Sequence, residues 1–159
     1  GRTLLQKVVD VTWDEWDSVM GINLKGGYFA AARLAEHCIG EGKAGSVINI
    51  ASTHDLTGLA GRSVYGISKG GLIQMARMLA IEWAEAGIRV NVVAPGTVLT
   101  ESRQKLLEDP DLRARMQARI PTGNFPLAQE IADAVLFLAS AGPSLTGQVI
   151  AVDGGLTAE

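Results

Sequence analysis

Tyr65 and Lys69 are the residues whose types and spacing best suit acid–base chemistry in this sequence. They stand four positions apart in SVYGISKGG, residues 63–71, so on a helix they share one face. A free tyrosine holds its proton too tightly to act at neutral pH, but a lysine ammonium within about 4–6 Å favours the phenolate. A tyrosine tuned in this way can protonate a carbonyl oxygen or deprotonate an alcohol, which suits hydride transfer with a nicotinamide.

The elements that would position these residues follow from three short, apolar, β-branched runs, which predict buried parallel strands. The runs are residues 46–51, 89–94 and 148–153. A capping box at Thr12–Glu15 opens a helix that pauses near Asn23 and ends near Gly40. Further helices are expected over residues 65–86, from residue 110, and over residues 128–140. Strands that alternate with helices imply right-handed parallel crossovers, and so a three-layer α/β arrangement in a single domain, residues 1–159.

The chemically useful residues fall at one edge of this predicted sheet. Ser52 directly follows the first strand, and Pro95 and Gly96 follow the second. Tyr65 begins the helix that leaves the loop after the first strand. Ligands of parallel sheets sit beyond the carboxyl ends of the strands. We therefore expect a site at this edge, with Ser52 holding the same oxygen that Tyr65 protonates or deprotonates.

Taken one at a time, these residues also have ordinary structural explanations. Tyr65 and Lys69 fit a solvated or half-buried surface pair, and Ser52 fits a turn or cap. Asn23 fits a side chain that bonds a backbone group at a helix kink. Pro95 and Gly96 would merely end a strand. Their convergence at one sheet edge favours the catalytic interpretation over these separate ones.

Two hydrolase patterns compete with this interpretation. Gly66–Gly70 matches the G-x-S-x-G nucleophile elbow around Ser68, but no strand directly precedes this serine and both histidines come before it. Ser52, His54 and Asp55 supply the residue types of a triad, but residues so close in sequence rarely reach its geometry. Two histidines and one cysteine, scattered along the chain, predict no metal site.

The composition is typical of a globular domain, with 47% apolar and 19% charged residues. A net charge of −3 without a basic cluster predicts no nucleic-acid or anionic-membrane partner. No apolar run approaches the roughly 20 residues of a membrane span, and the opening GRTLLQKVVDVT lacks a signal-peptide pattern. The single cysteine, Cys38, excludes an internal disulfide. We expect a cytoplasmic protein.

Several segments together resemble the classical short-chain dehydrogenase/reductase family. YGISK, residues 65–69, matches its Y-x-x-x-K motif, and Ser52 lies thirteen residues before the tyrosine, as the family's catalytic serine commonly does. INLKGGYFAAA resembles the segment with the catalytic asparagine, here Asn23. NVVAPGTVLT resembles the P-G-x-x-x-T element, and GQVIAVDGG resembles the closing strand. The resemblance covers essentially all 159 residues.

The resemblance implies a role for each matching residue. Tyr65 would be the acid–base, Lys69 would assist it and bond the nicotinamide ribose, and Ser52 would orient the substrate. Asn23 would hold a water in a proton relay with Lys69. The residues that would contact NAD or NADP are Tyr65, Lys69, Pro95, Gly96, Val98 and Thr100. The implied function is an NAD(P)-dependent oxidoreductase that acts on a ketone or secondary alcohol. The alternative is a non-catalytic, oligomerising α/β module.

The first half of the family's pattern has no counterpart here. Neither a glycine-rich T-G-x-x-x-G-x-G turn nor an N-N-A-G element occurs. We therefore expect the carboxy-terminal two-thirds of a partial Rossmann-like domain, without its dinucleotide-binding half. Such a chain would leave one sheet edge open and bind cofactor poorly alone.

Partners follow from the helices and from the charged stretch after the second strand. Helices around residues 24–40 and 65–86 are apolar on more than one face, which predicts a homodimer or homotetramer through them. Residues 101–125 would form a mobile lid over a small carbonyl or alcohol substrate. Its arginines either meet an acidic group or form a solvated face: Arg103, Arg113, Arg115 and Arg119.

Overall fold

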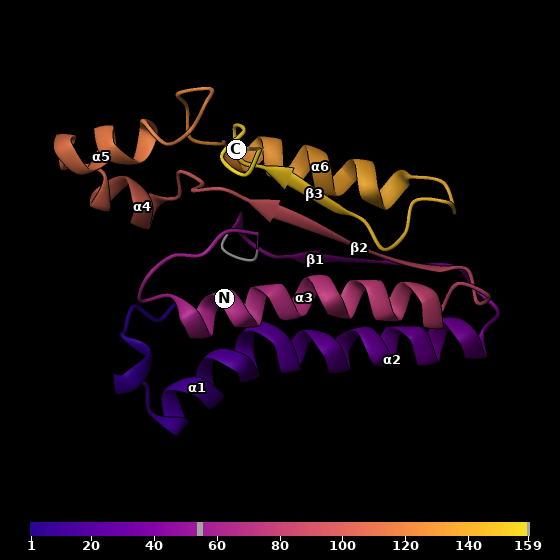
Figure 1. The fold of residues 1–159 in the computed structure, drawn as a ribbon. Helices are drawn as coiled ribbons and strands as arrows, with labels where there is room; N and C mark the ends of the chain where they lie inside the picture. The colour runs from indigo at the N-terminus through magenta and orange to yellow at the C-terminus, as the bar shows by residue number, and fades with distance from the viewer. Residues whose placement is uncertain (54–55, 159) are drawn as a thin grey trace.

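In the computed structural model, which describes residues 1–53 and 56–158, helices cover both faces of a three-stranded sheet (Figure 1). The strands are β1 (Gly45–Ile50), β2 (Ile88–Pro95) and β3 (Val149–Val152). They lie in the order β1-β2-β3 and all pair in parallel, with Val47 opposite Val90 and Val93 opposite Ile150. The predicted three-layer α/β arrangement with parallel strands is confirmed.

The core is built around β2, which is buried along almost its whole length. Successive side chains of a strand point to opposite faces, so β2 has two sets of contacts. Val90, Val92 and Ala94 belong to the main apolar cluster, together with Leu72 and other residues of α3 (Ser63–Glu82). On the other face, the Arg89 guanidinium donates to the Leu138 carbonyl of α6 (Ala128–Ser140) at 2.8 Å. This double cover explains the continuous apolar run that predicted the strand.

The helix before the sheet contains a wide turn that bears on the site. α1 (Trp13–Met20) starts at the predicted capping box, in which Thr12 Oγ1 accepts from Glu15 N and Glu15 Oε2 accepts from Thr12 N at 2.9 Å. The expected pause is η2 (Gly21–Lys25), one π-helical turn that leads directly into α2 (Gly26–Gly40). Such turns occur frequently at functional sites, and this one contains the buried Asn23.

Several element bounds differ from the predicted ones. α3 starts at Ser63 and ends at Glu82, so the chain turns through residues 83–87 before β2 begins. A short helix, α4 (Glu101–Leu106), precedes the expected α5 (Pro110–Gln117). α5 starts where Asp109 Oδ1 accepts from the backbone N–H of Asp111 and Leu112. The first helix of the chain is a short 3-10 turn, η1 (Val8–Asp10), which the sequence pattern did not predict.

β1 lies at one edge of the sheet and β3 at the other. The residues of β1 are all at least partly exposed, whereas those of β2 are almost all buried. The backbone groups on the outer side of such a strand are available to pair with another strand. That further strands pair with an open edge in a complete domain stays a prediction. Within the described part of the chain, no helix has both the length and the apolarity needed to cross a membrane.

Candidate active site

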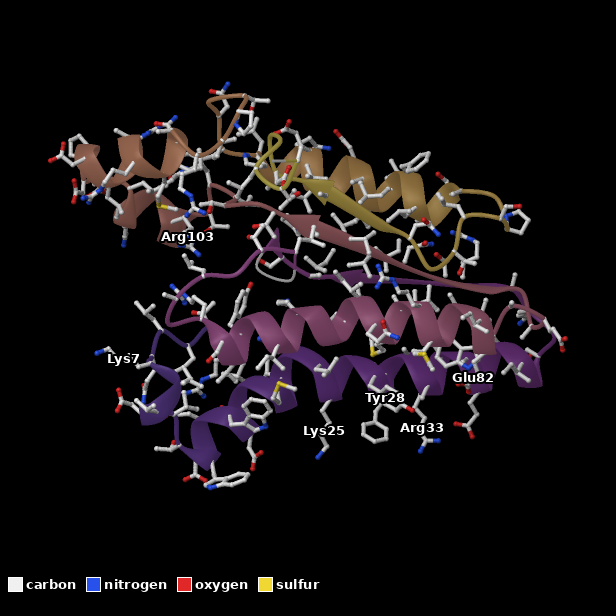
Figure 2. The ribbon with its side chains drawn as sticks, viewed as in Figure 1. Lys7, Lys25, Tyr28, Arg33, Glu82 and Arg103 are labelled. Carbon is white, nitrogen blue, oxygen red and sulfur yellow. The ribbon has the colours of Figure 1, made fainter. Side chains whose placement is uncertain are left out.

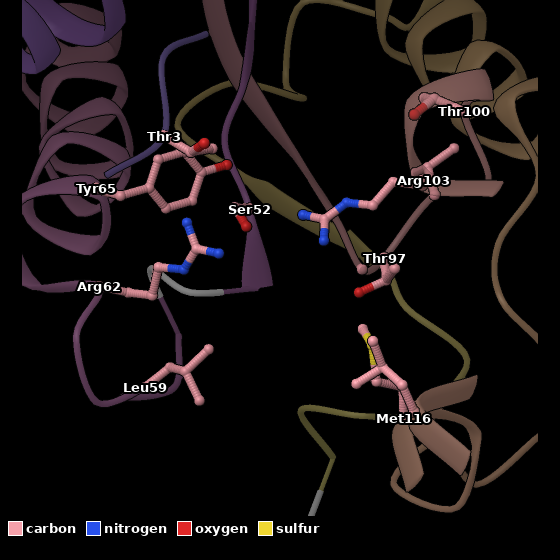
Figure 3. Close-up of a pocket in the computed structure, with 12 residues that line it drawn as sticks. Thr3, Ser52, Leu59, Arg62, Tyr65, Thr97, Thr100, Arg103 and Met116 are labelled. Carbon is pink, nitrogen blue, oxygen red and sulfur yellow. The ribbon is translucent and has the colours of Figure 1, made fainter. Parts of the chain in front are cut away.

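A cavity of about 370 Å³ opens at the carboxyl ends of β1 and β2 (Figure 3). Five of the predicted site residues line it: Ser52, Tyr65, Gly96, Val98 and Thr100. These residues come from the end of β1, the start of α3 and the segment after β2. Parallel strands bring their carboxyl ends to one edge, so the sheet topology gathers residues that are far apart in sequence.

Tyr65 lies in the first turn of α3, and Lys69 follows one turn later on the same face. The Tyr65 ring is half-buried at the cavity wall, while Lys69 is buried behind it. Lys69 Nζ donates to the Ile50 carbonyl oxygen at 2.8 Å and lies 5.8 Å from the centroid of the Tyr65 ring. The last residue of β1 therefore holds a positive charge close to the phenol.

Ser52 reaches the same cavity from the sheet. The residue before it, Ala51, extends the β1 ladder, because its N–H donates to the Val93 carbonyl at 2.8 Å. Ser52 is buried, and Figure 3 shows its hydroxyl on the side of the cavity toward which the Tyr65 hydroxyl points. A hydroxyl and a phenol placed in this way can both approach one oxygen atom of a bound molecule.

Asn23 does not line the cavity, but it is hydrogen-bonded to residues behind the cavity wall. Its Nδ2 donates to Ser68 Oγ at 3.0 Å, and that hydroxyl donates to the Tyr65 carbonyl at 2.7 Å. The same amide exchanges two hydrogen bonds with the backbone of Arg2. The side chains of Asn23 and Lys69 both lie next to Gly1. A Cβ atom at Gly1 would be 2.5 Å from Asn23 Oδ1 and 3.6 Å from Lys69 Nζ. The role of Asn23 in a water relay stays a prediction.

The segment after β2 forms the wall opposite α3. Pro95 is buried as the last residue of β2 and lies behind this wall rather than in the cavity. Gly96 N donates to the Val152 carbonyl at 3.0 Å, and a Cβ at Gly96 would come within 3.1 Å of Asp153 Cα. A side chain at this position would require the backbone of Asp153, just after β3, to shift, so glycine suits this close approach. Val98 and Thr100 follow in the same segment and also line the cavity.

The expected lid packs as a small unit of its own beside the cavity, formed by α4 and α5 (Figure 1). Its buried residues are Leu107, Ile120 and Phe125, against which Leu112 and Met116 pack. Leu112 and Met116 also line the cavity. Its mobility stays a prediction.

Some lining residues were not predicted from the sequence. Thr3 is brought in by the N-terminal segment, which is tied to the α3 loop by the hydrogen bond from Gln6 N to the Gly61 carbonyl at 2.8 Å. Leu59, Arg62 and Thr97 complete the walls. The spacing of Arg62, three residues before Tyr65 at the start of a helix, was a usable signal. Nothing local marked Thr3.

The elbow alternative is wrong, because Ser68 is fully buried inside α3. Its hydroxyl is hydrogen-bonded within the protein and does not line the cavity, so it is not an exposed nucleophile. His54 and Asp55 of the triad alternative lie outside the described residues. Among the residues that are described, no three His, Cys, Asp or Glu side chains form a group that could hold a metal ion.

The chain is similar in sequence and in structure to known dehydrogenases. A family model described as enoyl-(acyl carrier protein) reductase matches residues 1–157. The 2-dehydro-3-deoxy-D-gluconate 5-dehydrogenase of Escherichia coli (strain K12) is 39% identical over 142 residues, which are 89% of this chain and 56% of that protein. The chain thus spans less than two thirds of the length of the curated relatives it matches first.

Solved structures of dehydrogenases match the whole chain, and two of them illustrate the likeness. One is a gluconate 5-dehydrogenase from Burkholderia cenocepacia J2315 in complex with NADP and tartrate, with a TM-score of 0.93 and 31% identity over 100% of this chain and 62% of that chain. The other is a 4-hydroxyisoleucine dehydrogenase complexed with NADH, with a TM-score of 0.96 and 26% identity over 100% of this chain and 66% of that chain.

Proposed function

Because the chain belongs to the short-chain dehydrogenase/reductase family, we propose that it is the catalytic part of an NAD(P)-dependent oxidoreductase acting on a secondary alcohol or ketone. The observation that carries the proposal is the placement of Ser52 and Tyr65 in one cavity, with Lys69 Nζ 5.8 Å from the tyrosine ring centroid. The two dehydrogenase structures compared above are complexes with NADH and with NADP, which supports a nicotinamide cofactor.

In the oxidative direction, Tyr65 Oη takes the proton of the alcohol as the carbon loses its hydride. In the reductive direction, the same phenol returns the proton to the carbonyl oxygen. The Lys69 ammonium stabilises the negative charge of the phenolate between these steps. Ser52 Oγ donates a hydrogen bond to the substrate oxygen and holds it beside the phenol.

The wall after β2 fits a nicotinamide ring. Gly96 adds no side chain, Val98 supplies an apolar surface, and Thr97 and Thr100 supply hydroxyl groups in the lining. A flat ring with one amide group needs such a surface with a few polar groups at its rim. When bound, the nicotinamide supplies or accepts the hydride. Pro95, buried behind the wall, would keep this surface in place.

The proposal is tested by Tyr65→Phe in the complete protein that carries this chain. Loss of the phenol hydroxyl should lower turnover by about 10²–10⁴-fold, because proton transfer by one group contributes about that much. The Kd for the cofactor should change little. The matched control is Tyr28→Phe, the same change at the other tyrosine in the sequence, because Tyr28 lies on α2, away from the cavity, and phenylalanine keeps its apolar ring in the groove described below. Unchanged turnover in Tyr65→Phe would refute the assignment.

A second proposal concerns assembly and is favoured by an apolar groove on the outer face of α2 and α3. The groove has a volume of about 500 Å³, and its lining includes Met20, Leu24, Tyr28, Phe29, Met75 and Met78. Phe29 and Met78 are more than half exposed. Figure 2 shows Lys25, Tyr28 and Arg33 projecting on the side of the helices remote from the sheet. We infer that this face pairs with a second copy of the chain, which the expected homodimer or homotetramer also requires.

A further inference from the structure

Two arginines reach into the cavity beside the proposed catalytic pair. Arg62 is the residue directly before α3, and Arg103 lies on α4. Both are half-buried, and both line the cavity. Figure 3 shows their guanidinium groups pointing inward from opposite sides, with the Tyr65 and Ser52 hydroxyls near the upper part of the same space.

The cavity contains no described carboxylate to neutralise these charges. Apart from the arginines, the polar side chains of the described lining residues carry hydroxyls: Thr3, Ser52, Tyr65, Thr97 and Thr100. The contact of Arg62 Nη1 with the Leu4 carbonyl, at 3.5 Å, is at the outer limit of a hydrogen bond. The two ion pairs among the described residues involve Arg33 and Lys43, far from this site.

Two guanidinium groups that face one space raise its electrostatic potential, and the buried ammonium of Lys69 adds to it. Their mutual repulsion is strongest where water is excluded. A bound anion would offset this repulsion and would accept hydrogen bonds from the planar guanidinium groups. Arginine suits carboxylate in particular, because two parallel N–H donors match its two oxygens.

Building on the proposed function, we propose that Arg62 and Arg103 bind a carboxylate of the substrate, so that the enzyme acts on hydroxy acids or keto acids. The carboxylate lies between the two guanidinium groups while the hydroxyl or carbonyl group that reacts faces Tyr65 and Ser52. A cavity of about 370 Å³ is at the small end of ligand pockets, which favours a small acid when a nicotinamide shares the space.

The phosphates of a nicotinamide cofactor are a second source of negative charge. Arg103 is three residues after Thr100, which is expected near the cofactor, so its guanidinium would also suit a phosphate. The two sources differ in what the variants change. Replacing an arginine that binds the substrate changes the preference for acid over ester. Replacing an arginine that binds the cofactor changes the KM for NAD or NADP.

The test uses the complete protein and a panel of small hydroxy acids, each paired with its methyl ester, with NAD and with NADP. Neutral secondary alcohols such as 2-butanol and cyclohexanol complete the panel. The expected result is an acid whose kcat/KM exceeds that of its ester by about tenfold or more, the range of charge-assisted hydrogen bonds. Arg62→Gln and Arg103→Gln should each lower this acid-to-ester ratio by about tenfold through the KM for the acid, with the cofactor KM nearly constant.

Arg113→Gln is the matched control, because Arg113 is exposed on α5 and does not line the cavity. Its acid-to-ester ratio should equal that of the parent. Arg62→Lys and Arg103→Lys keep the charge without the planar donor pair, so they should recover only part of the ratio. Melting temperatures identify any variant that does not fold. If a glutamine variant does not fold, the acid-to-ester ratio of the corresponding lysine variant is compared with that of the parent instead.

Binding without turnover gives an independent readout. In a Tyr65→Phe background with cofactor present, the acid should raise the melting temperature and its ester should not, and Arg103→Gln should remove that shift. Oxidation of neutral alcohols or esters in preference to the acids would overturn the inference and leave the proposed function intact. A rise in cofactor KM with an unchanged acid-to-ester ratio would overturn it in favour of a phosphate site. Oxidation of no panel member with either cofactor would contradict the proposed function as well.

Discussion

The Nζ atom of Lys69 and the carbonyl oxygen of Ile50 lie 2.8 Å apart, so the ammonium is tied to the last residue of β1. This hydrogen bond joins the helix that carries the phenol to the strand that precedes Ser52. The charge is therefore placed by the sheet as much as by its own helix. A lysine side chain is long and flexible, and this anchor limits its freedom near Tyr65.

Lys69→Met is expected to lower turnover by about 10²-fold or more, because the phenolate loses the positive charge that stabilises it. Lys69→Arg should not restore activity, since a bulkier guanidinium does not fit the buried place of the ammonium. The measurement is kcat in the complete protein. Lys43→Met is the control, because Lys43 is exposed in the turn before β1 and pairs with Glu41. Equal turnover in Lys69→Met and Lys43→Met would contradict the proposed role.

Asn23→Ala is expected to destabilise the fold by about 1–3 kcal/mol, because it leaves Ser68 Oγ and the backbone of Arg2 without their amide partner. The measurement is the free energy of unfolding in urea. Asn124→Ala is the control, since Asn124 is exposed and its amide donates to the carbonyl of nearby Thr122.

A double-mutant cycle of Asn23→Ala with Ser68→Ala distinguishes the loss of the hydrogen bond between these side chains from a non-specific loss of stability. The two changes should be non-additive by at least about 0.5 kcal/mol, as for side chains in direct contact. Strict additivity would show that the Asn23–Ser68 hydrogen bond contributes nothing to the stability of the fold.

The lowered pKa of Glu15, at the start of α1, predicts that the stability of the fold depends on pH. The hydrogen bond from the Thr12 backbone, followed by that from the Thr12 side chain, lowers the pKa of the Glu15 carboxyl below its usual 4.5. A carboxyl whose pKa is lower in the folded state contributes stability above its unfolded pKa. That contribution is lost as the pH falls through the folded pKa.

Urea unfolding at pH 7 and at pH 3 therefore distinguishes the parent from Glu15→Gln. The parent should lose more stability between the two pH values than the variant, and Glu82→Gln, at an exposed position of α3, should behave like the parent. An equal loss in the parent and in Glu15→Gln would exclude a contribution of the capping box to the acid response.

Phe29→Glu is expected to separate the subunits if the groove on α2 and α3 pairs with a second copy, because it places a charge in an apolar interface. Sedimentation velocity of the complete protein measures the change. The control is Phe137→Glu, since Phe137 has a similar exposure but lies on α6, on the other side of the sheet. A Phe29→Glu protein of unchanged size would rule out this face as the contact.

Much of the fold was predictable because its signals are local. The capping box at Thr12, the start of α5 after Asp109 and the three apolar strands all lie within a few residues of their predicted positions. Capping, turn chemistry and the period of apolar residues depend on neighbours in sequence. The π-helical turn at Asn23 was visible only as a pause, because its width depends on packing against α3.

The sequence by itself determined the three strands, the main helices between them, the spacing of Tyr65 and Lys69, and the sheet edge at which Ser52 and Gly96 meet, since these follow from local periodicity and parallel topology. Only the tertiary structure decided that Arg62 and Arg103 share a cavity with Ser52. It also decided that Ser68 is buried and that Thr3 reaches the site. The physical reason is that these neighbours lie on separate elements, and the packing of those elements sets distances that no local pattern encodes.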